Sequence, residues 1–240
     1  MRLRHTLTTI AIAAGLTTIA PLTAAAARPG PTPPSDAPAR ATTTAAGVCD
    51  LSAPTRVAIS RPSLDLPTRI TGDCTATGSA SYWILTHPSQ GDVLDIGFES
   101  GATTYPWEVR STDPIGVQSF KPNGAWDPTD QPLTQNTLTT TVKLATGAWI
   151  SSSRADDVVT LRGTSLLYSV SDNVFFKRSA SGVFQYRDLG TTTWNNLKAV
   201  TTNTAGEVSM AYRYTPTREY RFALYSTPIS WDVASAITTR

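Results

Sequence analysis

Histidine and the residues it activates are the usual components of a nucleophilic active site, and this sequence offers few of them. Of its two histidines, only His87 lies beyond the first 27 residues, where it precedes Pro88 in a turn-like stretch. A serine or cysteine nucleophile needs a base, most often histidine, yet the sequence holds neither a Gly-x-Ser-x-Gly nor a Ser-x-x-Lys motif. We therefore predict no nucleophilic centre and interpret His87 as a surface residue of a turn.

Acidic residues beside tryptophan are the pattern that points toward hydrolysis. Glu108 follows Trp107, and Asp127 follows Trp126. Glycosidases use two carboxylates whose pKa values differ, one on each side of the scissile bond. Because nothing in the sequence makes Glu108 and Asp127 converge, a secreted hydrolase ranks as the second alternative function, and we predict that the protein is not an enzyme.

The sequence contains no motif for a metal or a cofactor. Transition metals need clustered histidine or cysteine ligands, which one histidine and two cysteines do not supply once the cysteines pair. Calcium prefers oxygen ligands, but the acidic stretches at 127–130, 156–157 and 172–173 lack the alternating acids and central glycine of a calcium loop. Phosphate-binding and dinucleotide motifs are missing as well. We predict no metal site and no cofactor, and calcium binding is the one alternative left open.

Aromatic side chains are the remaining lead to a binding function, because they form stacking platforms for sugar rings or anchor protein interfaces. Most tryptophans and tyrosines obey the alternation of a strand, and we predict that these pack in the core: Trp83, Trp194, Trp231, Tyr212 and Tyr220. Three others fall in turn-rich sequence, namely Tyr105, Trp107 and Trp126. These three are the predicted binding residues, and a carbohydrate-binding module that uses them is the first alternative function.

The overall charge balance gives no sign of a nucleic-acid partner. The chain contains 20 Lys and Arg against 18 Asp and Glu, and the excess is accounted for by Arg2 and Arg4 in a stretch without acids. Beyond that stretch the formal charge is zero, which leaves no electrostatic footprint for nucleic acid or an anionic membrane. We predict an extracellular protein or a cell-wall polysaccharide as the partner, and neither nucleic acid nor a membrane after signal cleavage.

The N-terminus has the order of a secretory signal peptide. Two arginines precede an apolar run that ends at Leu22, and small residues follow up to Ala27. This order predicts a signal peptide over residues 1–27 that is cleaved after Ala27 or one residue earlier, so that the protein is secreted and extracellular. An uncleaved membrane anchor is the rival interpretation.

A Pro-rich stretch and two cysteines follow the predicted cleavage site. Residues 28–46 hold five prolines among Ala, Thr, Gly and Ser, which predicts a disordered linker or a pro-segment that is removed. Cys49 and Cys74 allow one intramolecular pairing, and an exported chain with an even count favours it. We predict this disulfide, worth about 3 kcal/mol in the chain-entropy model; two free thiols are the alternative.

Short alternations of apolar and polar residues, separated by turn residues, predict an all-β fold beyond residue 47. In the first half we expect strands at 56–59, 69–74, 81–86, 93–98, 116–120 and 137–144, with turns at 87–91, 113–114 and 121–124. In the second half the faces are clearer, since Tyr220, Phe222 and Leu224 alternate with polar neighbours, and a last apolar face runs from Ile229 to Ile237. Tyr220 opens the penultimate strand, where Greek-key sandwiches place a structural tyrosine whose hydroxyl bonds the backbone upstream.

Five short blocks of the second half carry a resemblance to a known group: residues 158–163, 184–187, 190–197, 201–206 and 219–222. In this order they resemble the small Ig-like β-sandwich modules of secreted actinobacterial proteins of uncharacterised function, over residues 149–240. The resemblance implies the fold and export, and it transfers no catalytic residue. Gly101-Ala-Thr-Thr before Trp107 echoes Gly190-Thr-Thr-Thr before Trp194, so a diverged tandem repeat is one interpretation of the first half.

These observations predict two tandem antiparallel Ig-like (Greek-key) β-sandwich domains after a signal peptide and a Pro-rich linker. Domain 1 is expected over residues 47–148 with one disulfide, and domain 2 over residues 149–240. The predicted function is a secreted, non-enzymatic protein with an extracellular binding or structural role and no identified ligand. A protease inhibitor is a further interpretation that no motif of the sequence favours.

Overall fold

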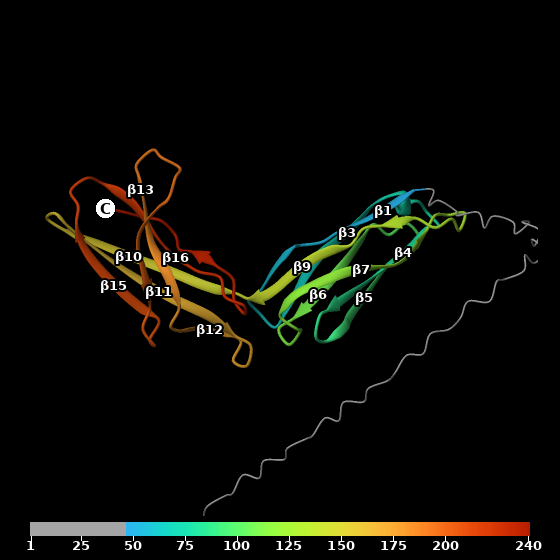
Figure 1. Ribbon diagram of the computed structural model, residues 1–240, viewed down its shortest axis with the longest axis horizontal. Helices are drawn as coiled ribbons and strands as arrows, with labels where there is room; N and C mark the ends of the chain where they lie inside the picture. Colours follow the sequence, from blue (N-terminus) through green and yellow to red (C-terminus); the bar gives the residue numbers. More distant parts are fainter. Residues whose placement is uncertain (1–46) are drawn as a thin grey trace, which may run out of the picture. The chain divides into compact units, whose positions relative to one another are not determined.

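The computed structural model describes residues 47–240, which form eighteen strands and one short 3-10 helix in four sheets. The strands fold into two β-sandwich units, coloured from blue to green and from yellow to red in Figure 1. The all-β, tandem-sandwich prediction is therefore confirmed. The predicted signal peptide and linker lie outside the described residues. Within residues 47–240 no helix has the length and hydropathy to cross a bilayer.

The first sandwich is built from β1 to β9. Their bounds are β1 Val48–Ser52, β2 Arg56–Ile59, β3 Ser63–Gly72, β4 Ala80–His87, β5 Gly91–Glu99, β6 Thr104–Arg110, β7 Gly116–Trp126, β8 Thr134–Gln135 and β9 Leu138–Leu144, with the 3-10 helix η1 at Asp73–Thr75. One sheet has the order β6-β3-β1-β8, and the other has the order β2-β9-β7-β4-β5. The first strand of the sandwich is thus divided, with β1 in one sheet and β2 in the other.

This strand order is that of an Ig-like Greek key. If β1 and β2 count as one strand and β8 and β9 as another, the first, second and fifth strands share a sheet, and the third, fourth, sixth and the longer part (β9) of the seventh form the opposite one. The expectation of purely antiparallel sheets needs a correction, because β1 pairs with β8 and β2 pairs with β9 in parallel. β1 therefore runs in the same direction as β8, and β2 in the same direction as β9.

The core of the first sandwich follows from strict alternation. In β4 the pattern places Ser81, Trp83 and Leu85 inside, and Trp83 is fully buried. Its ring meets Phe98 of β5 edge-on at 6.2 Å between centroids, and its indole Nε1 donates to the Asn136 carbonyl at 3.0 Å. A buried tryptophan of this size needs a partner for its polar N–H, and the loop between β8 and β9 supplies it.

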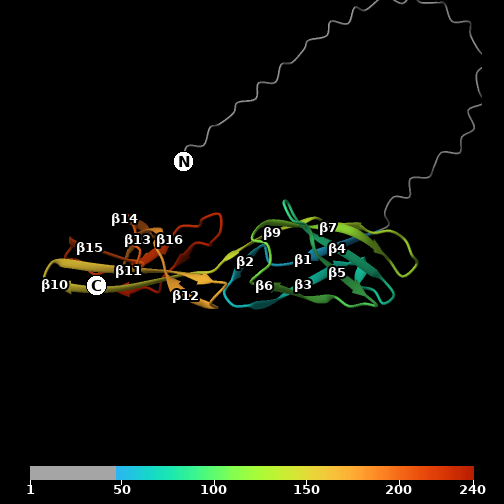
Figure 2. The same cartoon turned by 90° about the horizontal axis from the view of Figure 1, so that it is seen from below.

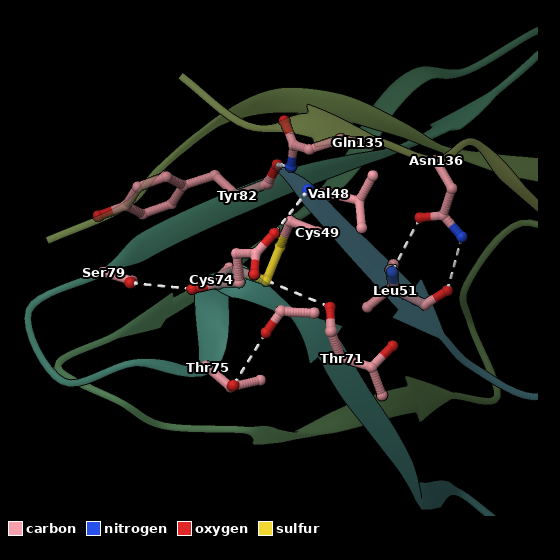
Figure 3. Close-up of a disulfide and its surroundings, with 12 residues drawn as sticks. Val48, Cys49, Leu51, Thr71, Cys74, Thr75, Ser79, Tyr82, Gln135 and Asn136 are labelled. Atoms are coloured by element: carbon pink, nitrogen blue, oxygen red, sulfur yellow. Dashed lines mark hydrogen bonds between the residues drawn. A yellow bond between two sulfur atoms is a disulfide. The ribbon is translucent and has the colours of Figure 1, made fainter. Parts of the chain in front are cut away.

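The predicted disulfide links Cys49 of β1 to Cys74 of η1, with Cα atoms 5.3 Å apart (Figure 3). It fastens the first strand to the loop that leaves β3. On the other side of β1, the Asn136 side chain accepts from the Leu51 amide at 2.8 Å and donates to the Leu51 carbonyl at 2.9 Å. The disulfide and the Asn136 pair therefore hold β1 from both sides, as Figure 3 shows.

The second sandwich is built from β10 to β18. Their bounds are β10 Thr146–Ala155, β11 Val158–Ser169, β12 Val174–Lys177, β13 Ser181–Asp188, β14 Asn195–Thr201, β15 Glu207–Arg213, β16 Arg218–Leu224, β17 Val233–Ala234 and β18 Thr238–Thr239. One sheet contains β10, β11 and β15, with β12 added to the far end of β11. The other runs β14-β13-β16, with β17 and β18 beside β16; Figure 2 shows β13, β14 and β16 gathered in one layer. With β12 set aside, the two sandwiches share one strand order.

Aromatic residues fill the second core. Phe184, Tyr220 and Phe222 are fully buried, and the two phenylalanine rings lie 5.1 Å apart. The prediction that Tyr220 is buried is confirmed, but its hydrogen-bond partner differs: its hydroxyl lies 2.6 Å from the Tyr212 hydroxyl instead of a backbone group. Burial and this hydrogen bond raise the pKa of Tyr220 above its ordinary value.

Several predicted elements differ from the structure. The turn expected at 121–124 lies inside β7, where the pairing with β4 shifts between Ser81 and Trp83. Gly124 has φ +104° there, and a side chain at this position would meet the ring of Trp126. The last apolar face expected from Ile229 to Ile237 is also wrong, since both residues are exposed and the segment holds only β17 as regular strand. The boundary expected between residues 148 and 149 falls within β10 and remains a prediction.

Candidate functional site

Trp107, the central residue of the predicted binding surface, lies in the core. It is 2% exposed on β6, and its ring meets Phe120 of β7 edge-on at 5.2 Å between centroids. The expectation that it offers a ring to a ligand is therefore wrong. The physical reason is that β6 is a regular edge strand whose inward side carries Tyr105, Trp107 and Val109.

The other two predicted aromatics do not complete a platform. Tyr105 is half-buried and packs edge-on against Phe98 at 6.2 Å between centroids. Trp126 is 40% exposed at the end of β7 in the opposite sheet, where it contacts Tyr82. The three rings thus belong to two sheets and to different surroundings. The structure does not bring them together.

A cleft of about 450 Å³ opens between the two sheets of the first sandwich, along β5 and β6. Its apolar wall includes Val93 and Leu94, and its polar rim includes Glu108, Arg110 and Asp113. The Glu108 carboxylate accepts from Arg110 at 3.1 and 3.2 Å and from the Ser63 hydroxyl at 3.0 Å. The contacts with Arg110 and then with Ser63 lower the pKa of Glu108, so the rim carries an ionised, already paired carboxylate.

The two acids of the hydrolase alternative lie at opposite ends of the first sandwich. Glu108 pairs with Asp65 near the start of β3, whereas Asp127 follows Trp126, which pairs with Ala80 beyond the end of β3. The intervening length of β3 puts the two acids more than about 20 Å apart. The pKa of Asp127 is also lowered, first by the Gln131 amide and then by Thr129. A glycosidase acid needs a raised pKa and a partner within about 10 Å, and this pair has neither.

The remaining polar candidates serve turns. His87 has Nε2 3.2 Å from the Ile115 carbonyl and Nδ1 3.2 Å from the Ser89 hydroxyl. In the acidic stretch 127–130, the Asp127 carboxylate accepts from the Thr129 amide and hydroxyl, both at 2.8 Å, as in an Asx turn. Among the described residues no group of three or more His, Cys, Asp or Glu side chains is placed to hold a metal ion.

The junction of the two sandwiches is held by backbone hydrogen bonds and by a buried aromatic side chain. Only Ala145 lies between β9 and β10. The Ala145 amide donates to the Ile59 carbonyl at 2.8 Å, and its carbonyl accepts from the Tyr168 amide at 3.0 Å. Tyr168 belongs to β11 of the second sandwich, yet it is 1% exposed within the core cluster of the first. The chain therefore passes between the sandwiches without a free linker.

Trp231 of the second sandwich contacts the first sandwich at this junction. Its indole Nε1 donates to the Val57 carbonyl at 2.6 Å. The Arg56 guanidinium lies 4.0 Å and the Lys143 ammonium 4.8 Å from the centre of its ring, which places two cations of the first sandwich against one ring of the second. Arg56 also pairs with Asp232 at 2.9 Å. Such cation–π contacts contribute about 0.5–2 kcal/mol each.

A second tryptophan with two cations lies on the outer face of the second sandwich. Trp194 precedes β14, and the guanidinium carbons of Arg187 and Arg221 lie 4.8 and 4.3 Å from the centre of its ring. These arginines come from β13 and β16, on the side opposite the inward Phe184 and Phe222. Because side chains alternate between the two faces of these paired strands, both cations lie beneath one ring.

Trp194, Trp231 and Tyr212, which are predicted to lie in the core, are only half-buried. A signal was present for Trp194, because it ends a Gly-Thr-Thr-Thr stretch, and arginines alternate with inward residues in the strands at 184–187 and 219–222. The pairing of these strands, which the pattern does not give, decides that both arginines meet the ring.

The nearly balanced charge of the chain is unevenly divided between the two sandwiches. Residues 47–145 carry six Lys and Arg against ten Asp and Glu, a net charge of −4. Residues 146–240 carry ten Lys and Arg against seven Asp and Glu, a net charge of +3. The two sandwiches therefore present fields of opposite sign, and Trp194 lies on the positive one.

No family model and no curated protein matches this sequence. Solved structures that are similar include alpha-2-macroglobulin of Salmonella reacted with methylamine, at 8% identity and a TM-score of 0.41 over 81% of this chain and 14% of that one. A tetra-tandem repeat in the extending region of a large adhesion protein is similar at 13% identity and a TM-score of 0.32, over 81% of this chain and 49% of that one. The BSP domain of a biofilm-associated protein is similar at 15% identity and a TM-score of 0.28, over 80% of this chain and 29% of that one.

The chain thus spans less than half the length of each of these three structures. Since every one of these TM-scores is below 0.5, the fold assignment rests on the strand order of the two sandwiches, and the likenesses add no inference about function. The resemblance of residues 149–240 to actinobacterial modules stays a prediction. What the chain is shown to be is a pair of Ig-like sandwiches.

Proposed function

We propose that this chain is a secreted, non-enzymatic protein whose two sandwiches act as one rigid module with a structural or binding role outside the cell. The observation that carries the proposal is the junction at Ala145 and Trp231. A chain that needs independent domains separates them by a polar linker. Here backbone hydrogen bonds, a shared aromatic residue and two cations against Trp231 replace that linker.

The contacts of the junction restrain both bending and rotation. Hydrogen bonds of the Leu144 amide to the Ile229 carbonyl at 2.9 Å and of the Trp231 amide to the Leu144 carbonyl at 3.1 Å hold one side of the connection. The Thr146 hydroxyl donates to the Trp231 carbonyl at 2.7 Å and ties the start of β10 to the same segment. Movement of one sandwich against the other would break several of these contacts together. A fixed spacing between two surfaces is useful for a spacer or a scaffold that presents a binding face.

The extracellular part of the proposal is supported by the disulfide between Cys49 and Cys74 and by the signal-peptide pattern of the N-terminus. Disulfides form and persist in oxidising compartments. In a host that exports the chain, protein from the culture medium should therefore resist thiol alkylation until a reductant is added. Recovery of the chain only from inside the cells, with both cysteines alkylated, would contradict secretion.

Rotational diffusion measured by ¹⁵N NMR relaxation tests rigidity directly. We expect the amides of both sandwiches in the wild-type protein to fit one diffusion tensor. Replacement of Trp231 by alanine removes the ring that Arg56 and Lys143 contact, so the two sandwiches of the variant should require separate tensors. Dispersed amide resonances in both halves would verify that the variant is folded.

Trp126→Ala is the matched control, because it also removes a half-exposed tryptophan but lies far from the junction. It should leave the single tensor unchanged. Arg56→Gln provides a milder second variant that keeps Trp231 in place. Two independent tensors in the wild-type protein would refute the rigid module, whatever the variants show.

A further inference from the structure

The face of the second sandwich around Trp194 carries a row of polar side chains joined by hydrogen bonds. The Arg221 Nε atom donates to the Gln185 side-chain oxygen Oε1 at 2.7 Å, and the Gln185 side-chain nitrogen Nε2 donates to the Asn196 side-chain oxygen Oδ1 at 2.8 Å. This row of side chains crosses β16, β13 and β14, and the Trp194 ring lies against one end of it. The polar groups are therefore held in place before any ligand arrives.

This face carries a positive charge that has no partner of opposite sign among the described residues. Arg187 is paired with Glu219, and both side chains are 23% exposed. Within residues 47–240 Arg221 forms no ion pair, and its terminal nitrogens make no hydrogen bond to another side chain or to the backbone. Burial and then the neighbouring Arg187 charge lower the pKa of Arg221. The cation is thus partly desolvated without a counterion.

The guanidinium groups and the Trp194 ring together determine which ligand fits this face. A guanidinium that stacks on a ring uses its flat face, and its N–H groups point outward in the plane of the group. Those groups match the two oxygens of a carboxylate. The indole offers an apolar surface beside them, against which the C–H face of a sugar ring buries area. A sugar that carries a carboxylate satisfies both features at once.

From this juxtaposition of Trp194 with the unpaired Arg221 and with Arg187, we propose that the outer face of β13, β14 and β16 binds an acidic polysaccharide through its uronate residues. The net charge of +3 on residues 146–240 attracts such a polymer at long range. The −4 charge on residues 47–145 directs it away from the first sandwich. This ligand is additional to the proposed function and does not depend on the junction.

Isothermal titration with polygalacturonate at low ionic strength tests the proposal, with fully methyl-esterified polygalacturonate as the matched neutral polymer. The wild-type protein should bind the acid form and bind the ester at least tenfold more weakly. Arg221→Gln and Trp194→Ala should each reduce affinity for the acid form at least tenfold. The first loses the charge that faces the carboxylate, and the second loses the surface that faces the sugar ring.

Two control variants separate this site from general attraction to positive charge. Arg213→Gln removes a cation of the same sandwich whose side chain is 81% exposed, and Trp126→Ala removes an exposed tryptophan of the first sandwich. Both should bind within twofold of wild type. Absence of wild-type binding, equal binding of the methyl ester, or an equal loss in Arg213→Gln would overturn the proposal.

Chemical-shift mapping on the wild-type protein keeps the test independent of variant folding. Addition of an oligogalacturonate should shift the indole N–H of Trp194 and the amides of residues 185–187, 194–196 and 219–221. Shifts confined to any other surface would overturn the proposal. Because no junction variant is used, a negative result here would leave the rigidity measured by relaxation untouched.

Discussion

The two sandwiches have the same strand order, but different interactions stabilise them. The first has a disulfide at β1, a fully buried Trp83 and an excess of acids. The second has no cysteine and an excess of bases, and its arginines stack on rings: Arg218 lies 3.6 Å from the ring centre of Tyr214 and 4.1 Å from that of Tyr186. The two sandwiches thus share inward alternation and strand order, while the contacts that hold their strand edges and ends differ. The following predictions test that separation.

Truncation of one core residue in each sandwich should have the largest effect. Trp83→Ala and Phe222→Ala remove fully buried rings, and changes of this kind cost about 3–5 kcal/mol. Hydrogen exchange read separately over residues 47–145 and 146–240 should show each loss in its own sandwich. Equal losses in both halves for either variant would mean that the two unfold as one cooperative unit.

Loss of the disulfide should affect only the first sandwich. A Cys49→Ala, Cys74→Ala double variant removes a loop closure of 25 residues, worth about 3 kcal/mol in the chain-entropy model. The midpoint of urea unfolding should fall for the first sandwich and stay constant for the second. Reduced wild-type protein is the control and should behave like the double variant; a matching shift in the second sandwich would break the comparison.

Alkaline pH should lower the stability of the second sandwich more than that of the first. The pKa of Tyr220 is raised in the folded protein by burial and by the Tyr212 hydroxyl, while an unfolded tyrosine titrates near about 10. Above that pH the unfolded state releases a proton that the folded state retains, so the stability of the second sandwich should fall as pH rises.

Tyr220→Phe should remove this alkaline loss and cost about 1 kcal/mol at neutral pH for the missing hydrogen bond. Tyr82 in the first sandwich also has a raised pKa, chiefly from its hydrogen bond to Glu99, but it lies at the surface. Tyr82→Phe is therefore the control and should leave the alkaline profile of the second sandwich as it is. An unchanged profile in Tyr220→Phe would disprove the assignment.

The smallest effect is expected at the ion pair that crosses the junction. Arg56 and Asp232 have side chains 47% and 54% exposed, and such pairs contribute about 0.2–1 kcal/mol. Asp232→Asn should lower the free energy of unfolding within that range at low salt and by less at about 1 M salt, where screening is strong. A cost above 2 kcal/mol would show that charge, more than the Trp231 ring, joins the sandwiches.

Local alternation predicted most of the fold. The strand at Arg56–Ile59 has the predicted bounds, since its inward Val57 and Ile59 alternate with exposed neighbours. The pairing of Cys49 with Cys74 was predictable because the chain has no other cysteine. In contrast, Tyr105 and Trp107 fall in sequence that predicts a turn-rich segment, whereas the structure has the regular strand β6 there. An edge strand tolerates proline, so β6 continues through Pro106 and its alternation turns Trp107 inward.

The candidate sites depend on pairing that sequence does not specify. Arg187 and Arg221 meet Trp194 because β13 and β16 align Gln185 with Arg221 and Arg187 with Glu219. A shift of either strand by one residue would turn the arginine of that strand to the inward face. Trp231 likewise depends on the approach of β2 and β9 to a segment more than 80 residues later in the chain. Periodicity gives the face of a side chain, but not the strand that lies next to it.

Tyr168 has a practical consequence for any attempt to divide the protein. A fragment that ends at residue 145 would lack a ring that fills its own interior, and would leave an apolar hollow open to water at its end. A fragment that begins at residue 146 would carry the same ring uncovered. Division of the chain between residues 145 and 146 is therefore expected to destabilise the first sandwich and to leave an uncovered aromatic side chain on the second.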